Sequence, residues 1–230
     1  MKNLLVVFAT LSLFSCQSDG DWAELFDGKS LNGWHAYGVT EGFNGWYVEQ
    51  GVIAFDPSKR TEARNSSLVS DQEYTDFELS LEWIISKNGN SGVFWSVIED
   101  EQYEHAYTTG PEVQILDDNY TEYIDQRGNK NRAGALYGMI APSEIVSNPA
   151  NQWNHFLIHV DQTKNEGFIE FNGTEVSRFP VNGPDWDAMV ANSGFADWPA
   201  FGKSPTGRIA LQDWGGRVAF RNIKIRELNQ

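Results

Sequence analysis

The sequence contains a single cysteine, Cys16, so no disulfide bond can form within the chain. It is also poor in basic residues: 17 Lys and Arg against 32 Asp and Glu give a formal net charge of −15. This balance argues against a nucleic-acid partner, because phosphates require a basic surface. There is neither a glycine-rich phosphate loop nor the GxSxG turn of serine hydrolases. The sequence thus gives no support for nucleotide binding or for serine-hydrolase chemistry.

The N-terminal apolar segment is too short to span a membrane. It runs from Leu4 to Phe14, about 11 residues, whereas a spanning helix needs roughly 20. A basic start before such a segment predicts a signal peptide over residues 1–15. The following cysteine completes Leu13-Phe14-Ser15-Cys16, which resembles a bacterial lipobox, and residues 16–21 form an acidic tether. Rather than a freely secreted protein, we expect a cell-envelope lipoprotein at the outer membrane, on its periplasmic or surface side, with the lipid as its membrane contact.

The remaining chain, residues 22–230, suits a single domain. Aromatic residues make up 13% of the sequence, which has 9 Trp and 21 Gly. Sugar rings stack their C–H faces on aromatic side chains, while carboxylates and amides bind their hydroxyl groups. The composition therefore favours a carbohydrate as the partner.

Short strands separated by turn signals dominate the pattern of this domain, and almost no segment has helical periodicity. The expected strands are Trp46–Phe55 (two strands broken at Gln50-Gly51), Ser67–Ser70, Phe77–Ile85, Gly92–Ile98, Glu112–Leu116, Gly134–Ile140, Trp153–Val160, Gly167–Asn172, Glu175–Phe179, Arg208–Trp214 and Arg217–Glu227. The last two should form a hairpin through Gly215-Gly216. Asp117–Arg132 should be a polar loop, and a helical turn is expected around Asp185–Val190. With no internal repeat, the pattern predicts an all-β sandwich or jelly roll of two antiparallel sheets.

The last expected strand changes the parity of its apolar residues. Val218 and Phe220 share one parity, and Ile223 and Ile225 share the other. A strand with one buried face cannot change parity without an extra residue, so a β-bulge is expected near Arg221-Asn222. A central strand that is apolar on both faces explains the pattern equally well.

Two expected strands carry polar residues along one face. Glu112 and Gln114 alternate with Val113 and Ile115, and Glu78, Ser80 and Glu82 alternate with apolar residues in the same way. Two such faces could line a groove between neighbouring strands. The alternative is that both simply meet water, as one side of an antiparallel sheet often does.

Metal-binding patterns are weak. His155 and His159 have the spacing of a helical metal pair, but their segment has the pattern of a strand and lacks the HExxH glutamate. Asp117-Asp118-Asn119, with Glu122 and Asp125, forms an oxygen-rich loop that could hold a hard cation. The spacing does not match an EF-hand, and a solvated loop is the competing interpretation.

An ordered set of short motifs spans nearly the whole of the expected domain, from about Trp22 to Leu228. The motifs are Leu25-Phe26-Asp27-Gly28-Lys29-Ser30-Leu31-Asn32-Gly33-Trp34, Phe77-Glu78-Leu79 with Glu82-Trp83, Gly89-Asn90-Ser91-Gly92-Val93-Phe94, Glu112-Val113-Gln114-Ile115-Leu116-Asp117, Trp153-Asn154, Phe171-Asn172-Gly173, Ile209-Ala210-Leu211-Gln212-Asp213 and Phe220-Arg221-Asn222-Ile223-Lys224-Ile225. Together they resemble the 3-keto-disaccharide hydrolase domain family, once called a domain of unknown function and abundant in Bacteroidetes-type lipoproteins.

The resemblance implies a concanavalin-like jelly roll with a substrate groove on its concave face. It also implies cleavage of glycosides whose glucose unit is oxidised at C3. A ketone at C3 acidifies the proton on C2, so a base can remove it while the C1 aglycone leaves, and water can then add back. A direct two-carboxylate glycosidase mechanism is the alternative.

On this resemblance Glu112 is the first choice for the catalytic base or acid, and Glu82 is its expected partner on an adjacent strand. The expected substrate-binding residues are Asn90, Gln114, Asp117, Gln212, Trp214 and Arg221. Among them, Arg221 would orient a carboxylate or stabilise the enolate, and Asp117 would cap the groove or help to bind a cation. No cofactor is certain; a divalent cation, Ca or Mn, is one option.

The chain departs from the family at Trp214, because many members carry a histidine after the Leu-Gln-Asp motif. Either that histidine is dispensable, or the chemistry is altered, or the protein only binds. A non-catalytic surface lipoprotein that binds glycans is therefore the alternative function.

Overall fold

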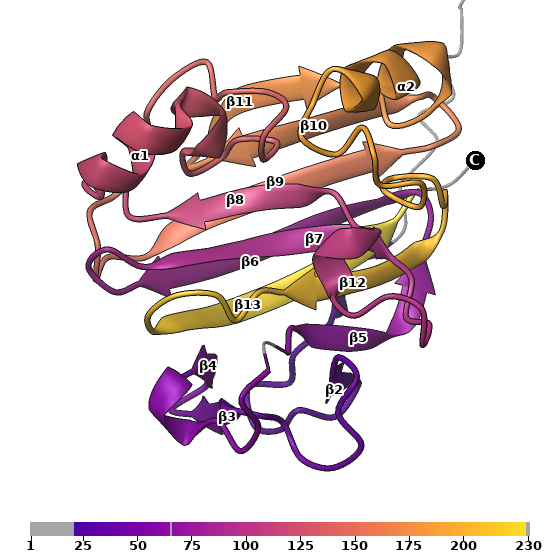
Figure 1. Ribbon diagram of the computed structural model, residues 1–230. Helices are drawn as coiled ribbons and strands as arrows, with labels where there is room; N and C mark the ends of the chain where they lie inside the picture. Colours follow the sequence, from indigo (N-terminus) through magenta and orange to yellow (C-terminus); the bar gives the residue numbers. More distant parts are fainter. Residues whose placement is uncertain (1–20, 65, 229–230) are drawn as a thin grey trace, which may run out of the picture.

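The computed structural model describes residues 21–64 and 66–228, in which two antiparallel sheets form a sandwich (Figure 1). The larger sheet has the strand order β11-β10-β9-β6-β13-β4-β3, with β1 paired to β13, and the smaller has the order β2-β5-β12-β7-β8. The predicted fold class is confirmed. The predicted signal peptide and Cys16 lie outside the described residues.

Most strands lie where the sequence predicts them, but β2 was not expected, and β5 continues past Ser70 to Tyr74, where a turn was expected. Their bounds are β1 Ala23–Glu24, β2 Trp34–Ala36, β3 Trp46–Glu49, β4 Val52–Phe55, β5 Leu68–Tyr74, β6 Phe77–Ile85, β7 Asn90–Val97, β8 Glu112–Leu116, β9 Asn154–Asp161, β10 Glu166–Phe171, β11 Thr174–Phe179, β12 Gly207–Leu211 and β13 Val218–Glu227. The helices are α1 Thr121–Arg127 and α2 Gly183–Ala191, and the 3-10 turns are η1 Pro57–Lys59, η2 Ala106–Thr108 and η3 Asn129–Asn131.

The hydrophobic core fills the space between the two sheets. Leu79, Leu81 and Trp83 of β6 face it from the larger sheet, and Val113 and Ile115 of β8 face it from the smaller one. All five are at most 1% exposed. Burying a side chain of this size contributes about 2 kcal/mol, so the alternation that was visible in the sequence fixes which face of each strand points inward.

The last strand contains the bulge that its parity change predicts. The pairing of β13 with β6 shifts register between Arg221 and Lys224, and Asn222 has a φ of 51°. The extra residue lets Phe220 and Ile223 both face the core, where each is fully buried.

Three local predictions are wrong. Gly134–Ile140 forms no strand: Gly134 and Gly138 have positive φ, and isolated bridges alone join Leu136 to Val113 and Ile140. The expected loop 117–132 contains α1. The expected hairpin through Gly215-Gly216 does not exist, because β12 and β13 belong to different sheets. Long-range pairing decides that last point, and it overrides the local turn signal.

Within the described ranges, no helix combines the length and apolar character that crossing a membrane would require.

Candidate functional site

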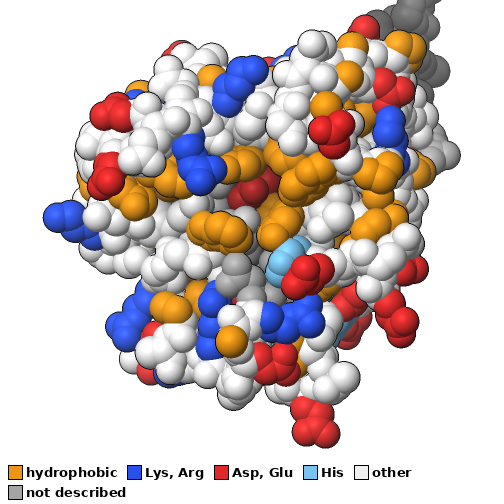
Figure 2. Space-filling view, in the orientation of Figure 1, with side chains coloured by type: hydrophobic (Ala, Val, Ile, Leu, Met, Phe, Trp, Pro, Cys, Tyr) orange, Lys and Arg blue, Asp and Glu red, His pale blue; other side chains and the backbone are white. Residues whose placement is uncertain are grey.

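A cavity of about 360 Å³ opens on the outer face of the five-stranded sheet. Figure 2 shows this hollow with an acidic side chain at its base and hydrophobic side chains around it. The floor comes from neighbouring strands: Asn90 and Phe94 from β7, Glu112 and Gln114 from β8, and Gln212 directly after β12. Because Val113 and Ile115 face the core, alternation along β8 turns Glu112 and Gln114 outward into the cavity.

Aromatic side chains from the connecting segments follow one another around the rim. Tyr137 lies 6.4 Å from Phe195, Phe195 lies 5.4 Å from Trp198, and Trp198 lies 5.9 Å from Tyr107, between ring centroids. Trp214 meets Tyr107 edge-on at 6.3 Å and is 49% exposed. Such rings offer flat apolar surfaces above a polar floor, an arrangement suited to a pyranose.

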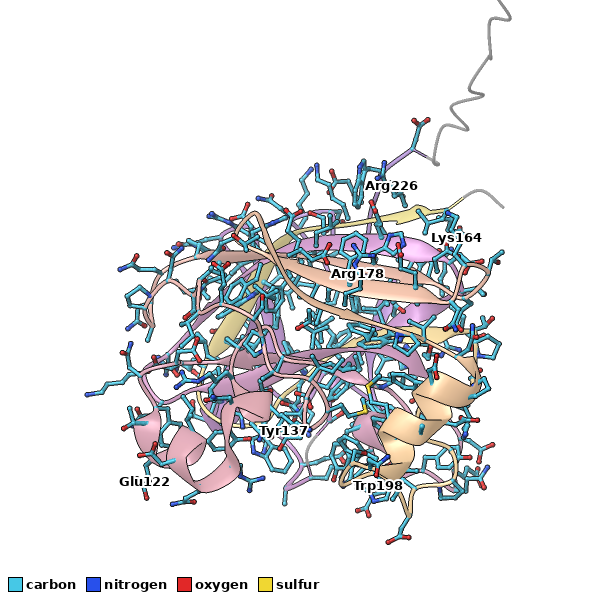
Figure 3. All side chains as sticks on the ribbon, turned by 90° about the horizontal axis from the view of Figure 1, so that it is seen from above. Glu122, Tyr137, Lys164, Arg178, Trp198 and Arg226 are labelled. Atoms are coloured by element: carbon cyan, nitrogen blue, oxygen red, sulfur yellow. The ribbon has the colours of Figure 1, made fainter. Side chains whose placement is uncertain are left out.

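Figure 3 separates the two outer faces of the sandwich. Tyr137 and Trp198 lie on the cavity side, whereas Arg178, Arg226 and Lys164 lie on the opposite side, over the eight-stranded sheet. The cavity therefore belongs to the face of the smaller sheet alone.

Glu112 is buried without a compensating charge. It is 7% exposed, and its Oε1 atom has no hydrogen-bond partner among the described residues. Burial raises the pKa of the Glu112 carboxyl well above its usual value. Gly92, on the adjacent strand, leaves room for this carboxyl because it has no side chain. A carboxyl with a raised pKa in a hollow is suited to proton transfer near neutral pH.

The amides of the floor leave further acceptor atoms without partners. Gln114 Nε2 donates to Asn90 Oδ1 and to the Asn131 carbonyl, each at 3.3 Å. The Oε1 atoms of Gln114 and Gln212 are buried and have no partner within the described chain. Since an unpaired buried acceptor is costly, these oxygens mark positions where a ligand would supply hydroxyl donors.

Tyr123 of α1 brings a hydroxyl group to the wall above Asn90. Its oxygen lies 3.3 Å from the Tyr137 hydroxyl, and Arg127 Nη1 donates to that Tyr137 hydroxyl at 3.4 Å. Burial is the larger cause and the hydrogen bond with Tyr137 the smaller cause that raise the pKa of Tyr123. The hydroxyl of Tyr123 is therefore neutral and able to donate across the physiological pH range.

Asp213 fixes the segment that carries Gln212 and Trp214. Its carboxylate accepts a 2.6 Å hydrogen bond from the Ser66 backbone N–H and pairs with Arg60 Nη2 at 2.9 Å. Burial raises the pKa of Asp213 to about 6, while the Ser66 N–H and the Arg60 charge act in the opposite direction. This pair ties the end of β12 to the chain before β5.

A small recess lies behind the rim, between Tyr107 and Trp214. His105 borders it and stacks on Tyr107, with 4.7 Å between ring centroids. Burial lowers the pKa of His105, so its imidazole is neutral at pH 7. It stands next to the cavity but does not line it.

Five of the residues predicted from the sequence come together in the cavity. They are Asn90, Glu112, Gln114, Gln212 and Trp214. They lie on β7, on β8 and in the segment that follows β12, and Glu112 and Gln114 are buried in the cavity and do not simply meet water.

Glu82 and Arg221 lie elsewhere. The expectation that Glu82 stands on a strand adjacent to Glu112 is wrong, because β6 and β8 belong to different sheets. Glu82 Oε2 accepts a 2.6 Å hydrogen bond from Arg221 Nη2, and Oε1 accepts one of 2.6 Å from Asn222. Burial raises the pKa of Glu82, but the hydrogen bonds from Asn222 and Arg221 outweigh it and hold the pKa below its usual value. These residues form an ion-paired cluster on the other outer face.

Asp117 is buried at a turn and does not reach the cavity. Its carboxylate accepts backbone hydrogen bonds from Asn88 at 2.9 Å and Asn119 at 3.1 Å. It therefore ties the turn before β7 to the turn after β8.

Across residues 21–64 and 66–228, no group of three or more His, Cys, Asp or Glu side chains is arranged to hold a metal ion. The oxygen-rich loop is dispersed: Asp118 accepts a hydrogen bond from Ser147, and Glu122 points outward from α1 (Figure 3). The loop gives no support to the expected cation.

Sequence reasoning missed most of the wall. The missed residues are Tyr107, Tyr123, Arg127, Tyr137, Phe195 and Trp198. They come from helices, turns and loops in which side chains follow no simple period. The available signal was an aromatic surplus in such segments, particularly 184–204, which holds Trp186, Phe195, Trp198 and Phe201.

Comparisons with known proteins identify the family and the fold. The sequence model of the "3-keto-alpha-glucoside-1,2-lyase-like domain" family matches residues 21–226. A 3-keto-disaccharide hydrolase of Bacteroides thetaiotaomicron is 32% identical over 234 residues, covering 92% of this chain and 80% of the relative. A crystal structure from Parabacteroides distasonis, named as a candidate glycosyl hydrolase, has a TM-score of 0.80 at 29% identity and covers 91% of this chain and 94% of its own. A family 66 carbohydrate-binding module of Bacillus subtilis shares the fold alone, with a TM-score of 0.50 at 10% identity, covering 85% of this chain and 96% of the module.

Proposed function

This chain belongs to the 3-keto-alpha-glucoside-1,2-lyase-like domain family, and we propose that it cleaves 3-keto-glycosides or related disaccharides in the cavity around Glu112. The bond broken is the one between C1 of the oxidised glucose unit and the aglycone oxygen. The reaction is an elimination followed by addition of water, so its net result is hydrolysis.

The observation that carries the proposal is the number of carboxylates in the cavity. Glu112 is the single acid among the described residues that line it. Direct glycoside hydrolysis commonly uses two carboxyl groups about 5–9.5 Å apart. One carboxyl group is sufficient for elimination from a 3-keto sugar, because the ketone supplies the activation that a second carboxyl would otherwise provide.

The Glu112 carboxyl can carry each proton of the sequence in turn. As a carboxylate it takes the C2 proton, and the electron pair moves into the C2–C3 bond and onto the C3 oxygen. The enolate then collapses, C1=C2 forms, and the C1–O bond breaks as the aglycone oxygen takes the proton from Glu112. Addition of water at C1 and protonation at C2 reverse these steps and release 3-keto-glucose. The raised pKa of Glu112 makes its carboxylate a stronger base.

The test uses a 4-nitrophenyl 3-keto-glucoside and the matching unoxidised glucoside. The purified protein should release 4-nitrophenol from the keto compound alone, and Glu112→Gln should lower that rate at least 100-fold. In deuterated water the released sugar should carry deuterium at C2. Failure to release 4-nitrophenol from either anomer of the keto compound would sink the proposal, and equal cleavage of the unoxidised glucoside would point to a direct mechanism.

A glycan-binding protein without activity is the second candidate, and the exposure of Trp214 favours it. A tryptophan that is 49% exposed at the rim is a platform for a sugar ring. This function predicts tight binding of the ketone or parent sugar without turnover, with little loss of affinity in Glu112→Gln. Calorimetry on both proteins separates it from catalysis.

We further propose that Cys16 carries a lipid that holds the protein at the outer membrane. The support is the sequence Leu13-Phe14-Ser15-Cys16 together with the short tether of residues 16–21. The tether would join the domain at β1, which pairs with β13 in the eight-stranded sheet, whereas the cavity lies on the other sheet. Palmitate labelling should mark the wild-type protein and not Cys16→Ser; absence of label from both contradicts the anchor.

A further inference from the structure

The unpartnered atoms on the floor of the cavity are hydrogen-bond acceptors, whereas the oxygen of a ketone needs a hydrogen-bond donor. The Oε1 atoms of Glu112, Gln114 and Gln212 are all buried and unpartnered in the described chain. Each can receive a sugar hydroxyl, but none of these oxygens can hold the C3 oxygen of a keto sugar, which has no hydrogen to give. The developing enolate oxygen requires a donor even more strongly, since it gains negative charge. The wall offers such a donor in the hydroxyl of Tyr123, which also lines the cavity.

Arg127 leaves the Tyr137 hydroxyl free to donate within the Tyr123–Tyr137 pair. A guanidinium group can only donate, so Tyr137 accepts from Arg127 Nη1 and keeps its own hydrogen to give. Either oxygen of the pair, 3.3 Å apart, can be the donor. When a ligand oxygen takes the Tyr123 hydrogen, the Tyr137 hydrogen can therefore turn to the Tyr123 oxygen in its place. Both contacts are long, since the usual distance is about 2.7–2.8 Å for a hydroxyl pair and about 2.9–3.0 Å for an N–H donor to oxygen, so a ligand oxygen competes well for the Tyr123 hydrogen.

The surroundings favour negative charge at this point of the wall. Arg127 is the single cation among the described residues that line the cavity, and its Cζ lies 5.0 Å from the centre of the Tyr123 ring. The Asn90 side chain also acts to lower the pKa of Tyr123, which means that it favours negative charge on that oxygen. A neutral hydroxyl that is backed by a guanidinium polarises toward an oxyanion without losing its proton.

We propose that the Tyr123 hydroxyl donates a hydrogen bond to the C3 oxygen of the 3-keto sugar, with Tyr137 and Arg127 supporting it, and thereby stabilises the enolate. Tyr123 is then a second catalytic residue beside Glu112, and no proton changes hands at C3. The inference rests on the proposed function. It also orients the sugar: C3 faces α1, and the C2 hydrogen faces Glu112.

The test separates formation of the enolate from departure of the aglycone. 3-Keto-glucose has no aglycone, yet a protein that forms the enolate exchanges its C2 hydrogen for deuterium, which proton NMR follows. Tyr123→Phe should slow this exchange, and the kcat for 4-nitrophenol release, about 100-fold, as loss of one oxyanion donor does elsewhere. KM should change less than threefold, because the bond strengthens in the transition state.

Tyr120→Phe is the matched control. Its ring lies 5.7 Å from that of Tyr123, at the start of α1, but it does not line the cavity. The rate of C2 hydrogen exchange in Tyr120→Phe should stay within twofold of the wild-type rate. The exchange rate of Arg127→Gln should lie between the rates of the two tyrosine variants. If the wild type exchanges and cleaves while Tyr123→Phe keeps its kcat within threefold, this inference is overturned and the proposed function stands. If the wild type neither exchanges nor cleaves, both are overturned.

Discussion

Gly92 and Glu112 fit together so closely that a Cβ atom on Gly92 would lie 2.0 Å from Oε1 of Glu112. The carboxyl group rests over the bare backbone of β7, and this contact determines where it sits. Gly92 does not have a positive φ, so the backbone at this position accepts any L-residue. Glycine is therefore required at position 92 to leave space for the Glu112 carboxyl, and not because of the backbone conformation.

Gly92→Ala should displace the Glu112 carboxyl and lower kcat at least tenfold, since a shift of about 1 Å at a reacting group is costly. The far end of a flexible side chain can move aside, so the melting temperature should fall by only a few degrees. Gly194→Ala is the control, because it has no neighbour within 4 Å and no positive φ. Full activity in Gly92→Ala would show that the carboxyl position seen here is not the working one.

The stability of the fold should depend on pH through Glu112. Its folded-state pKa is raised above 4.5 by burial, so folding holds its proton more tightly than the unfolded chain does. Its stabilising contribution is fully present below the unfolded pKa and is lost as pH rises through the folded pKa. Each pKa unit by which the folded state exceeds the unfolded state corresponds to about 1.4 kcal/mol of unfolding free energy.

Glu112→Gln removes this titration and keeps the shape. Urea unfolding at pH 5 and pH 9 should show that the variant gains stability over the wild type as pH rises. If the difference in unfolding free energy between the two proteins is the same at both pH values, the pKa of the Glu112 carboxyl is not raised.

Removal of Arg60 should destabilise the protein strongly. Arg60 is the cation that faces the buried Asp213 carboxylate at 2.9 Å, and Asp213 is 1% exposed. Arg60→Met leaves that charge unpaired, at a cost of about 3 kcal/mol. The double variant Arg60→Met/Asp213→Asn should recover most of the loss in denaturant titrations. Equal stability of the single and double variants would show that the two residues are not coupled.

Glu82→Gln should leave turnover within twofold of the wild type, because Glu82 lies on the other outer face and pairs with Arg221. The pair is partly exposed, so its loss should cost about 0.5 kcal/mol of stability. Steady-state kinetics on the keto-glucoside, together with thermal melting, check both values. A loss of turnover comparable with that of Glu112→Gln would return Glu82 to the reaction.

Local chemistry predicted most of the strands, gave the bulge as one of two explanations for the parity change, and supplied one half of the floor. The bulge follows from the parity of Phe220 and Ile223, since each has to reach the same core. Glu112 and Gln114 stand side by side because residues two apart share one face of a strand. The motifs also gave the family, and the comparisons confirm it.

Only the tertiary structure decided which sheet each strand joins and which loops close the cavity. Glu82 has the same alternation as Glu112, and nothing local distinguishes the sheet that contains β6 from the one that contains β8. Tyr123 and Tyr137 come from α1 and an irregular turn, where side chains have no fixed period to reveal their direction. Pairing between residues far apart in the sequence depends on how the whole core packs, and so the acid on β8 came from the sequence, whereas the wall that faces it came from the fold.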